Sequence, residues 1–434
     1  MLALRNIPIH LLVAGSAWAG RVVGAAVQII SIRFLMKNLG ADHYSTFALL
    51  TALLSWLMLI DFGLGNSLQN HISERRAKNK NSQALIMAAC LGMLGFVILT
   101  TILLALFSSA IGSSYLKSVT FLNTDGKTEI LFITGLIFAL TAAGNIPFKI
   151  WFAQGKGWLA NIIPALGLAC GMIMLTTSGI SDHDHALPHA IVYFYTPNAV
   201  ISVGCLLYIW LQNKTRIRQR VFLAAWRLLL SRSWEFWLFS VLATLVLQSD
   251  YIVMSQQLDT TTIAMYAMLQ KFFGLAFFVY AALLQALWPK CAELHATKNW
   301  QEMHKLSARY IKIGMAGMLA FTLLFLLMQP FIMHLFSSKL LADSSTILLF
   351  GCYFLLRIWC DTYAMLLQSM SKIKALWLIV PLQAAISLGL QLLLAPPLQI
   401  NGILLGLMLS FLFTSAIVNP LAFHRFLRNT LRNN

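Results

Sequence analysis

At the middle of the chain, Asn213–Ser233 reads NKTRIRQRVFLAAWRLLLSRS, which interleaves five arginines with short apolar runs. This pattern is typical of an amphipathic helix lying in the membrane interface. Six apolar segments precede the stretch and six follow it. Each has the roughly 20 residues needed to cross the hydrocarbon core of a bilayer. The stretch therefore divides a membrane protein into two halves of six helices each.

The loops on the two sides of the apolar segments differ sharply in charge. We place the segments at about residues 9–36, 44–64, 83–109, 129–151, 157–178, 188–212, 234–257, 262–288, 308–336, 344–370, 375–395 and 400–423. Of the 31 Lys and Arg, 23 fall on the side that carries both chain ends, and four lie inside segments. The other side holds the remaining four, Lys37, Lys117, Lys127 and Lys339. Because basic loops resist translocation, both termini are predicted to be cytoplasmic.

The composition is typical of an integral membrane protein. Hydrophobic residues make up 59% and charged residues 10%, against about 25% charged residues in soluble domains. The net charge of +17 is read as an orientation signal and an attraction to anionic membrane lipids, not as a sign of nucleic-acid binding.

The predicted fold is an all-α integral membrane protein with twelve transmembrane helices in two parallel six-helix lobes around a central cavity. The lobes span residues 1–212 and 234–434, and residues 213–233 form a cytoplasmic basic amphipathic linker. Both lobes start from the inside, as parallel repeats do. A weak internal echo supports the repeat, since Tyr44 and Tyr266 each open the second helix of a lobe.

Two stretches carry a resemblance to a known family. Asp61–Arg76 reads DFGLGNSLQNHISERR, and Gln248–Gln256 reads QSDYIVMSQ, followed by MYAMLQK and LWP. These stretches, with the helix count and repeat layout, resemble the polysaccharide-exporter branch of the multidrug/oligosaccharidyl-lipid/polysaccharide exporter superfamily, and within it the Wzx-type O-antigen flippases.

The resemblance implies movement of an undecaprenyl-diphosphate-linked oligosaccharide from the inner to the outer leaflet of a bacterial inner membrane. It also implies association with a polysaccharide polymerase and chain-length machinery. A cationic, water-filled cavity would carry the diphosphate and the sugar while the lipid tail stays in the bilayer. The sequence should therefore place positive charge at membrane depth.

Four basic residues lie inside apolar segments. Arg21, Lys271 and Arg357 fall near mid-segment, and Arg33 lies closer to the outer end of the first segment. Intramembrane charge costs about 2.5–3.5 kcal/mol on insertion scales and usually marks function or an internal pair. We predict that these four residues bind the diphosphate. The alternatives are that Arg357 neutralises Asp361 four residues away and that Arg33 reaches the interface.

Acidic residues are the candidates for ion coupling. Asp250 lies near mid-segment and is the leading candidate for a site that binds a proton or cation, with a salt bridge to a cavity cation as the alternative. Asp361 and Asp61 are further candidates. Asp61 directly precedes Gly63 and Gly65, so a helix boundary and turn is its simpler role.

Other chemistry has little support in the sequence. An outer loop holds His183, His185 and His189, which we interpret as a solvated loop rather than a metal site. Walker A, GxSxG and HExxH motifs are lacking, so the chain is predicted to be neither an enzyme nor an ATP-driven pump, and no cofactor is expected.

Two other function classes remain beside the flippase. One is a cation-coupled multidrug-type small-molecule antiporter of the same superfamily, which needs no basic cavity. The other is a membrane enzyme such as a polymerase or ligase, which would carry catalytic residues in a sizeable outer loop. Intramembrane Arg and Lys favour the flippase over the first, and short outer loops count against the second.

Overall fold

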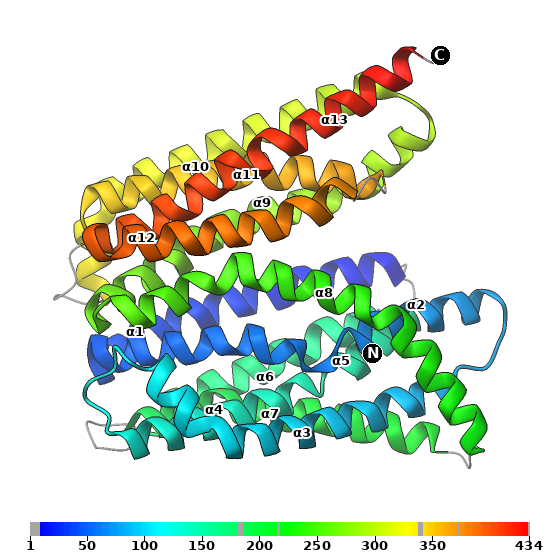
Figure 1. Cartoon of the computed structure of the whole chain (residues 1–434), viewed down its shortest axis with the longest axis horizontal. Coiled ribbons are helices and arrows are strands. Elements are labelled where there is room, and N and C mark those ends of the chain that lie inside the picture. The colour runs from blue at the N-terminus through cyan, green and yellow to red at the C-terminus, as the bar shows by residue number, and fades with distance from the viewer. Residues whose placement is uncertain (1–8, 180–185, 215–217, 337–341, 371–373, 433–434) are drawn as a thin grey trace. The chain divides into compact units, whose positions relative to one another are not determined.

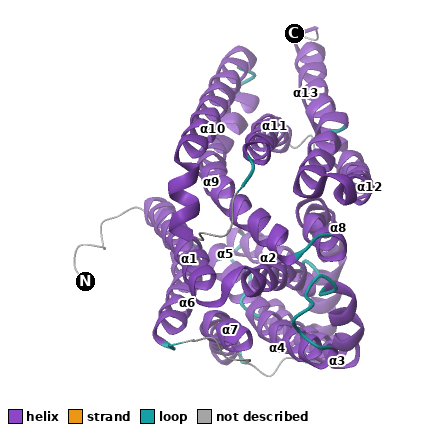
Figure 2. Ribbon diagram, turned by 90° about the vertical axis from the view of Figure 1, so that its left-hand side faces the viewer, coloured by secondary structure: helices purple, strands orange, loops and turns teal. Residues whose placement is uncertain are grey.

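The computed structural model describes residues 9–179, 186–214, 218–336, 342–370 and 374–432, and within these ranges every regular element is a helix (Figure 2). In chain order they are α1 (Ile9–Leu57), the short 3-10 helix η2 (Met58–Asp61), α2 (Leu64–Ala77), α3 (Gln83–Tyr115), α4 (Thr124–Ala142), α5 (Asn145–Ala153), α6 (Gly157–Thr177), α7 (Ala186–Asn213), α8 (Gln219–Gln257), α9 (Thr260–Ala296), α10 (Trp300–Phe336), α11 (Ser344–Ser369), α12 (Lys374–Phe413) and α13 (Ser415–Arg432) (Figure 1). The prediction of an all-α architecture is confirmed.

Ten stretches of the described chain are long and apolar enough to cross a membrane. Two of them, Gly15–Asp61 and Trp377–Phe426, run for 47 and 50 residues, more than twice the roughly 20 residues that one crossing needs. Each covers two of the segments predicted from the sequence. The protein is thus a multi-pass membrane protein with ten to twelve long apolar helices.

The long helix α12 contains a reversal of the chain. Its backbone leaves the helical region at Gln399 (φ 50°, ψ −127°). A Cβ added at Gly402 would lie 2.0 Å from the Leu394 carbonyl oxygen, and one at Gly406 would lie 2.8 Å from the Gln391 nitrogen. Residues 15 apart in a straight helix are separated by about 22 Å. The segments predicted at 375–395 and 400–423 therefore pack against each other, and the two glycines permit the approach.

A second break joins the first two predicted segments. Gly40 has φ 84° and ψ −180° inside α1, a conformation that glycine adopts without steric cost. The second segment was predicted to reach residue 64, but α1 ends at Leu57 and η2 closes at Asp61. Phe62 and Gly63 then take positive φ values of 48° and 73°, which no helix continues through.

The segment predicted at 129–151 is two helices, α4 and α5, separated at Ala143 and Gly144. Pro147 explains the position of the break between α4 and α5. Proline lacks the N–H that would bond the carbonyl of Ala143, four residues earlier, and its ring clashes with that carbonyl. Pro147 consequently sits in the first turn of the new helix, where it is tolerated.

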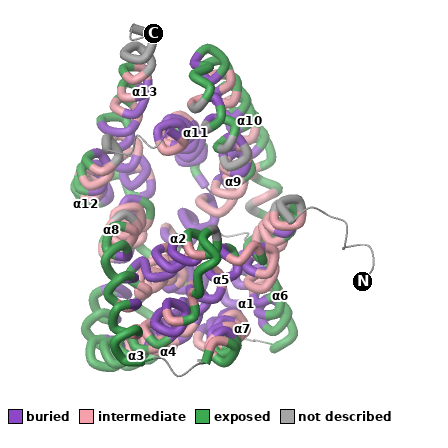
Figure 3. Tube along the Cα trace, turned by 90° about the vertical axis from the view of Figure 1, so that its right-hand side faces the viewer, coloured by how far each residue is buried: buried purple, intermediate pink, exposed green. Residues whose placement is uncertain are grey.

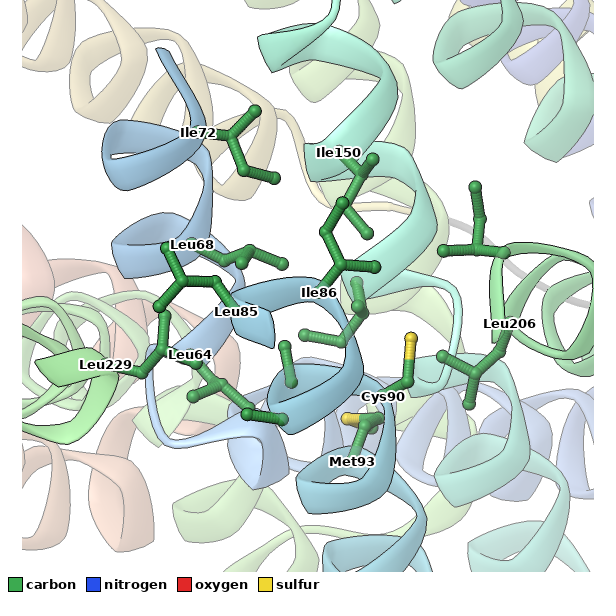
Figure 4. Packing of buried hydrophobic residues seen from close by; sticks show 14 of the residues in the cluster. Leu64, Leu68, Ile72, Leu85, Ile86, Cys90, Met93, Ile150, Leu206 and Leu229 are labelled. Atoms are coloured by element: carbon green, nitrogen blue, oxygen red, sulfur yellow. The ribbon is translucent and has the colours of Figure 1, made fainter. Parts of the chain in front are cut away.

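Contacts divide the chain into two compact units, residues 1–244 and 245–434. The basic amphipathic stretch belongs to the first unit and continues without interruption into the apolar part of α8. In the first unit, α2, α3, α5, α7 and α8 pack around a shared apolar cluster that includes Leu68, Ile86, Ile150, Leu206 and Leu229 (Figure 4). The amphipathic part of α8 is thereby anchored on the core of the unit that precedes it.

Many residues of α3 are exposed (Figure 3), and several of them are large and apolar. Ile98, Ile102 and Leu106, at four-residue spacing, are 51–69% exposed. A stripe of this kind would be unfavourable in water but matches the acyl chains of a bilayer. The outward face of α3 therefore suits contact with lipid.

Candidate functional site

Asp250 is a buried acid on α8 within the second unit. Asp250 is only 3% exposed, and its neighbours on the helix are mostly apolar. The backbone N–H of Tyr251 donates to one carboxylate oxygen at 2.9 Å, and the hydroxyl of Tyr266 on α9 donates to the other. Burying a carboxylate is expensive unless such donors replace water. Asp250 is thus held in place by neutral groups of two helices.

Arg357 and Asp361 form an ion pair on α11, with Arg357 Nη2 3.0 Å from Asp361 Oδ2. The pairing predicted from their four-residue spacing is present. The guanidinium also lies over the Phe277 ring, 4.6 Å from the centroid, in a cation–π arrangement. Its Nε atom is buried and has no hydrogen-bond partner among the described residues. The ion pair therefore leaves part of the donor capacity of Arg357 unused.

Tyr353 connects these two groups. Its side chain is buried, hydrogen-bonds with Arg357, and interacts electrostatically with both Asp250 and Asp361. Sequence reasoning missed this residue, although Tyr353, Arg357 and Asp361 follow each other at four-residue spacing along one helical face. The second unit thus contains a continuous polar cluster of Asp250, Tyr266, Tyr353, Arg357 and Asp361.

The other predicted cations have different environments. Lys271 is half-buried on α9 in the second unit. Arg21 is half-buried on α1 in the first unit, and its guanidinium carbon lies 5.9 Å from the centroid of the Trp18 ring. Arg33, also in the first unit, is exposed. Arg21 and Arg33 both lie in the part of α1 that precedes the break at Gly40.

Asp61 organises the turn between η2 and α2. Its two carboxylate oxygens accept backbone N–H groups from Gly63 at 2.9 Å and Gly65 at 3.3 Å, as a capping side chain does at a helix start. A Cβ at Gly65 would meet Asp61 Oδ2 at 3.0 Å and Lys149 Cγ at 3.2 Å. Asp61 therefore has the local structural role that its position before two glycines suggested, with Lys149 beside it.

Of the three histidines that were predicted to lie in one outer loop, the structure describes only one. His183 and His185 lie outside the described residues, and His189 is an exposed residue of α7 whose ring lies 6.0 Å from that of Tyr193. Within the described ranges, no group of three or more His, Cys, Asp or Glu side chains could hold a metal ion.

At the basic end of the first unit, α2 and α8 are joined by charged side chains. Arg232 Nη1 lies 2.6 Å from Glu74 Oε1, and His71 Nδ1 lies 3.9 Å from the other oxygen of Glu74. Burial and, second, the nearby Arg232 charge lower the pKa of His71. The hydrogen bond from Arg232 lowers the pKa of Glu74. The group is an ion pair with a neutral imidazole beside it.

Comparison of the sequence with known proteins gives extended matches. A family model described as "Polysaccharide biosynthesis protein" matches residues 13–295. A putative O-antigen export protein of Yersinia pseudotuberculosis is 38% identical over 425 residues, covering 96% of each chain. Putative O-antigen transporters of Salmonella typhi and Salmonella typhimurium are 39% and 40% identical, covering 95% of each chain.

Solved structures share the fold at low sequence identity. An inward-facing multidrug resistance transporter of the MATE family superposes with a TM-score of 0.73 at 13% identity, covering 94% of this chain and 96% of the other. The lipid II flippase MurJ in an inward closed conformation superposes with a TM-score of 0.68 at 13% identity, covering 95% and 87%. The fold is therefore the one shared by MATE transporters and MurJ.

Proposed function

Because the chain belongs to the polysaccharide biosynthesis protein family, we propose that it is a flippase for a lipid-linked oligosaccharide. The substrate would be an undecaprenyl-diphosphate-linked O-antigen or similar repeat unit, moved from the inner to the outer leaflet by alternating access. The observation that carries this proposal is the near-full-length similarity to O-antigen transporters of 38–40% identity. The chain acts as a transporter and not as an enzyme.

The proposed topology has twelve spans with both termini in the cytoplasm of a bacterial cell and the protein in the inner membrane. The distribution of Lys and Arg supports this orientation. The two broken helices, α1 and α12, support a count of twelve, since each would supply two spans. Residues 1–212 and 234–434 would form parallel six-helix lobes, with residues 213–233 resting on the cytoplasmic membrane surface.

The cations on apolar helices are the proposed diphosphate ligands. Arg21, Lys271 and Arg357 would attract the diphosphate, and Arg33 would act near the outer end of the path. A guanidinium binds two phosphate oxygens at once, whereas an ammonium acts as a point charge. Support comes from the unused buried Nε of Arg357 and from the half-burial of Arg21 and Lys271.

The acids are the proposed coupling groups. Asp250 is favoured, because its carboxylate is buried on an apolar helix and its two described hydrogen-bond donors are neutral groups. Asp361 would respond through Arg357. Asp61 has the least support, because its oxygens already cap the start of α2. The proposed partners are the lipid-linked substrate, membrane lipids, a polysaccharide polymerase and chain-length machinery.

The proposal is tested by a leaflet-resolved assay. In cells depleted of the protein, lipid-linked repeat units should accumulate in the inner leaflet, where an impermeant sugar-modifying reagent cannot reach them. Re-expression should restore labelling from outside. If the outer-leaflet pool is unchanged on depletion while efflux of small cationic drugs falls, the protein is an antiporter and the proposal fails.

A further inference from the structure

A cavity of about 480 Å³ lies within the second unit, beside the starts of two helices and the break in a third. α9 begins beside it after the N-cap Asp259, α11 begins beside it after Asp343, and α12 breaks beside it at Gln399. The polar lining residues are Thr261, Thr262, Asp343, Thr346, Gln399 and Asn401. Small-molecule sites typically have volumes of about 300–1,000 Å³. The cavity is large enough for a sugar, and its lining shares no residue with the cluster around Asp250 and Arg357.

The charge of the described lining favours a neutral ligand over the diphosphate. Among the described lining residues, Asp343 is the one ionisable side chain, and none is Lys or Arg. An anion would meet the Asp343 carboxylate without a compensating cation. A cation would face the positive ends of the α9 and α11 dipoles, which aim at the same region. A neutral polar ligand avoids both penalties.

The hydrogen-bonding groups of the cavity are fixed in place. Thr346 Oγ1 donates to Asn401 Oδ1 at 2.8 Å, and Asn401 Nδ2 donates to Ser345 Oγ at 3.4 Å. These bonds tie the start of α11 to the second half of α12. Thr261 and Gln399 are exposed lining residues, so a hydroxyl and an amide are accessible to a ligand. Both group types donate and accept, as sugar hydroxyls do.

The backbone conformation of Gln399 indicates that its side chain has a role at this turn. Its φ of 50° is disfavoured for a residue with a Cβ, whereas glycine adopts such a φ without strain. Glutamine nevertheless stands at this turn, and its amide lines the cavity between Leu398 and Ile400. The two aliphatic neighbours provide apolar surface of the kind on which the C–H face of a sugar ring rests.

We propose that this cavity binds the neutral sugar part of the lipid-linked substrate, separately from the diphosphate. The inference rests on the proposed flippase function. On the proposed topology, the starts of α9 and α11 and the break in α12 all face the outside. The cavity would hold the oligosaccharide as it emerges on the outer side, while the cations deeper in the membrane hold the diphosphate.

The test measures binding of the sugar alone to the full-length protein in lipid nanodiscs. The probe is the free oligosaccharide released by mild acid from accumulated lipid-linked units, followed by saturation-transfer difference NMR. Wild-type protein should give sugar signals that millimolar inorganic diphosphate does not reduce. Thr261→Trp, which fills the cavity, should abolish them. Gln399→Gly, which relieves the backbone at the turn, should weaken binding by about two- to tenfold, the effect of one lost hydrogen bond.

Ser344→Trp is the matched control, because Ser344 is also an exposed residue in the first turn of a helix but does not line the cavity. It should bind sugar as wild type does. Wild-type affinity in Thr261→Trp, or displacement of the sugar by diphosphate, would overturn the inference. Transport of the lipid-linked unit by wild-type protein that binds no free sugar would also overturn it while leaving the flippase function intact. Sugar binding without transport would support the cavity and refute the flippase.

Discussion

The hydroxyl of Tyr266 donates a hydrogen bond to the carboxylate of Asp250, and both residues are buried. The bond links α8 to α9 across 16 residues of sequence. A second neutral donor, the Tyr251 N–H, occupies the other oxygen. An acid on an apolar helix is therefore stabilised by neutral hydrogen-bond donors from its own unit.

Tyr266→Phe should lower the free energy of unfolding by about 1–3 kcal/mol, because the buried carboxylate loses one of its donors without gaining water. Thermal unfolding of the purified protein in detergent measures the effect. Tyr310→Phe is the control, since Tyr310 lies on α10 in the same unit and is half-buried, and its hydroxyl has no hydrogen bond to another described residue. Equal stability of the two variants would contradict the importance of the Tyr266 bond.

Asp250→Asn should stop gradient-driven transport while leaving substrate binding largely intact. The amide keeps the shape of the side chain but can neither release a proton nor hold a cation, so one access state is favoured. Vesicles with an imposed pH or sodium gradient provide the measurement. Asp259→Asn, at an exposed helix cap, should respond as wild type does. A wild-type gradient response in Asp250→Asn would exclude this residue as the coupling site.

Arg21→Ala and Lys271→Ala should each severely reduce surface polysaccharide, with Arg21→Lys retaining more activity than Arg21→Ala. A charge-assisted hydrogen bond to a phosphate contributes about 1.5–3 kcal/mol. Surface polysaccharide is measured in complemented cells at matched protein levels. Lys37→Ala, at an exposed residue outside the apolar segments, is the control. Normal polysaccharide in both alanine variants would show that these charges are structural.

Cysteine labelling tests the orientation. In a background with Cys170 and Cys352 replaced by serine, a cysteine at Asp125 should react with an impermeant thiol reagent from outside, and cysteines at Lys80 or Arg218 should not. All three positions are exposed in the structure. Labelling at Lys80 or Arg218 in intact cells would refute a cytoplasmic amino terminus.

Stability should fall as the pH drops below about 6.5, the ordinary pKa of histidine. The folded state lowers the pKa of His71, so the unfolded chain binds the proton first and protonation favours unfolding. Glu74 adds a second loss below about pH 4.5, because its pKa is also lowered in the folded state. Melting temperatures from pH 8 to 4 measure both. His71→Gln should flatten the upper step and Glu74→Gln the lower one; an unchanged profile in His71→Gln would contradict the assignment.

The helices were largely predictable. A chain in lipid must satisfy its backbone hydrogen bonds within helices, and those helices are built mainly from apolar residues. The ends of α6 and α7 lie within two residues of the predicted segments. The breaks were harder. A loop was expected around Gly40 and before Ile400, whereas the structure has sharp changes of backbone direction inside continuous helical runs. Hydropathy reports which residues prefer lipid and carries no information on how a turn is made.

The candidate site was predictable only where its contacts are local. Arg357 and Asp361 pair through helical periodicity, which sequence spacing reveals. The contact between Asp250 and Tyr266 depends on how α8 packs against α9, and the position of Tyr353 depends on a third helix. No spacing rule covers such contacts. The role of Asp61 in a turn was predictable from the glycines that follow it, since its side chain accepts hydrogen bonds only from residues up to four positions ahead.

The close packing at Gly402 and Gly406 constrains how the chain is inserted during synthesis. The two apolar halves of α12 are joined by a turn of a few residues around Gln399. On the proposed twelve-span topology, each half crosses the bilayer, and so short a turn would favour their insertion together as a hairpin. A bulky residue at Gly402 would then act on biogenesis as well as on the finished protein, lowering the yield of inserted chains.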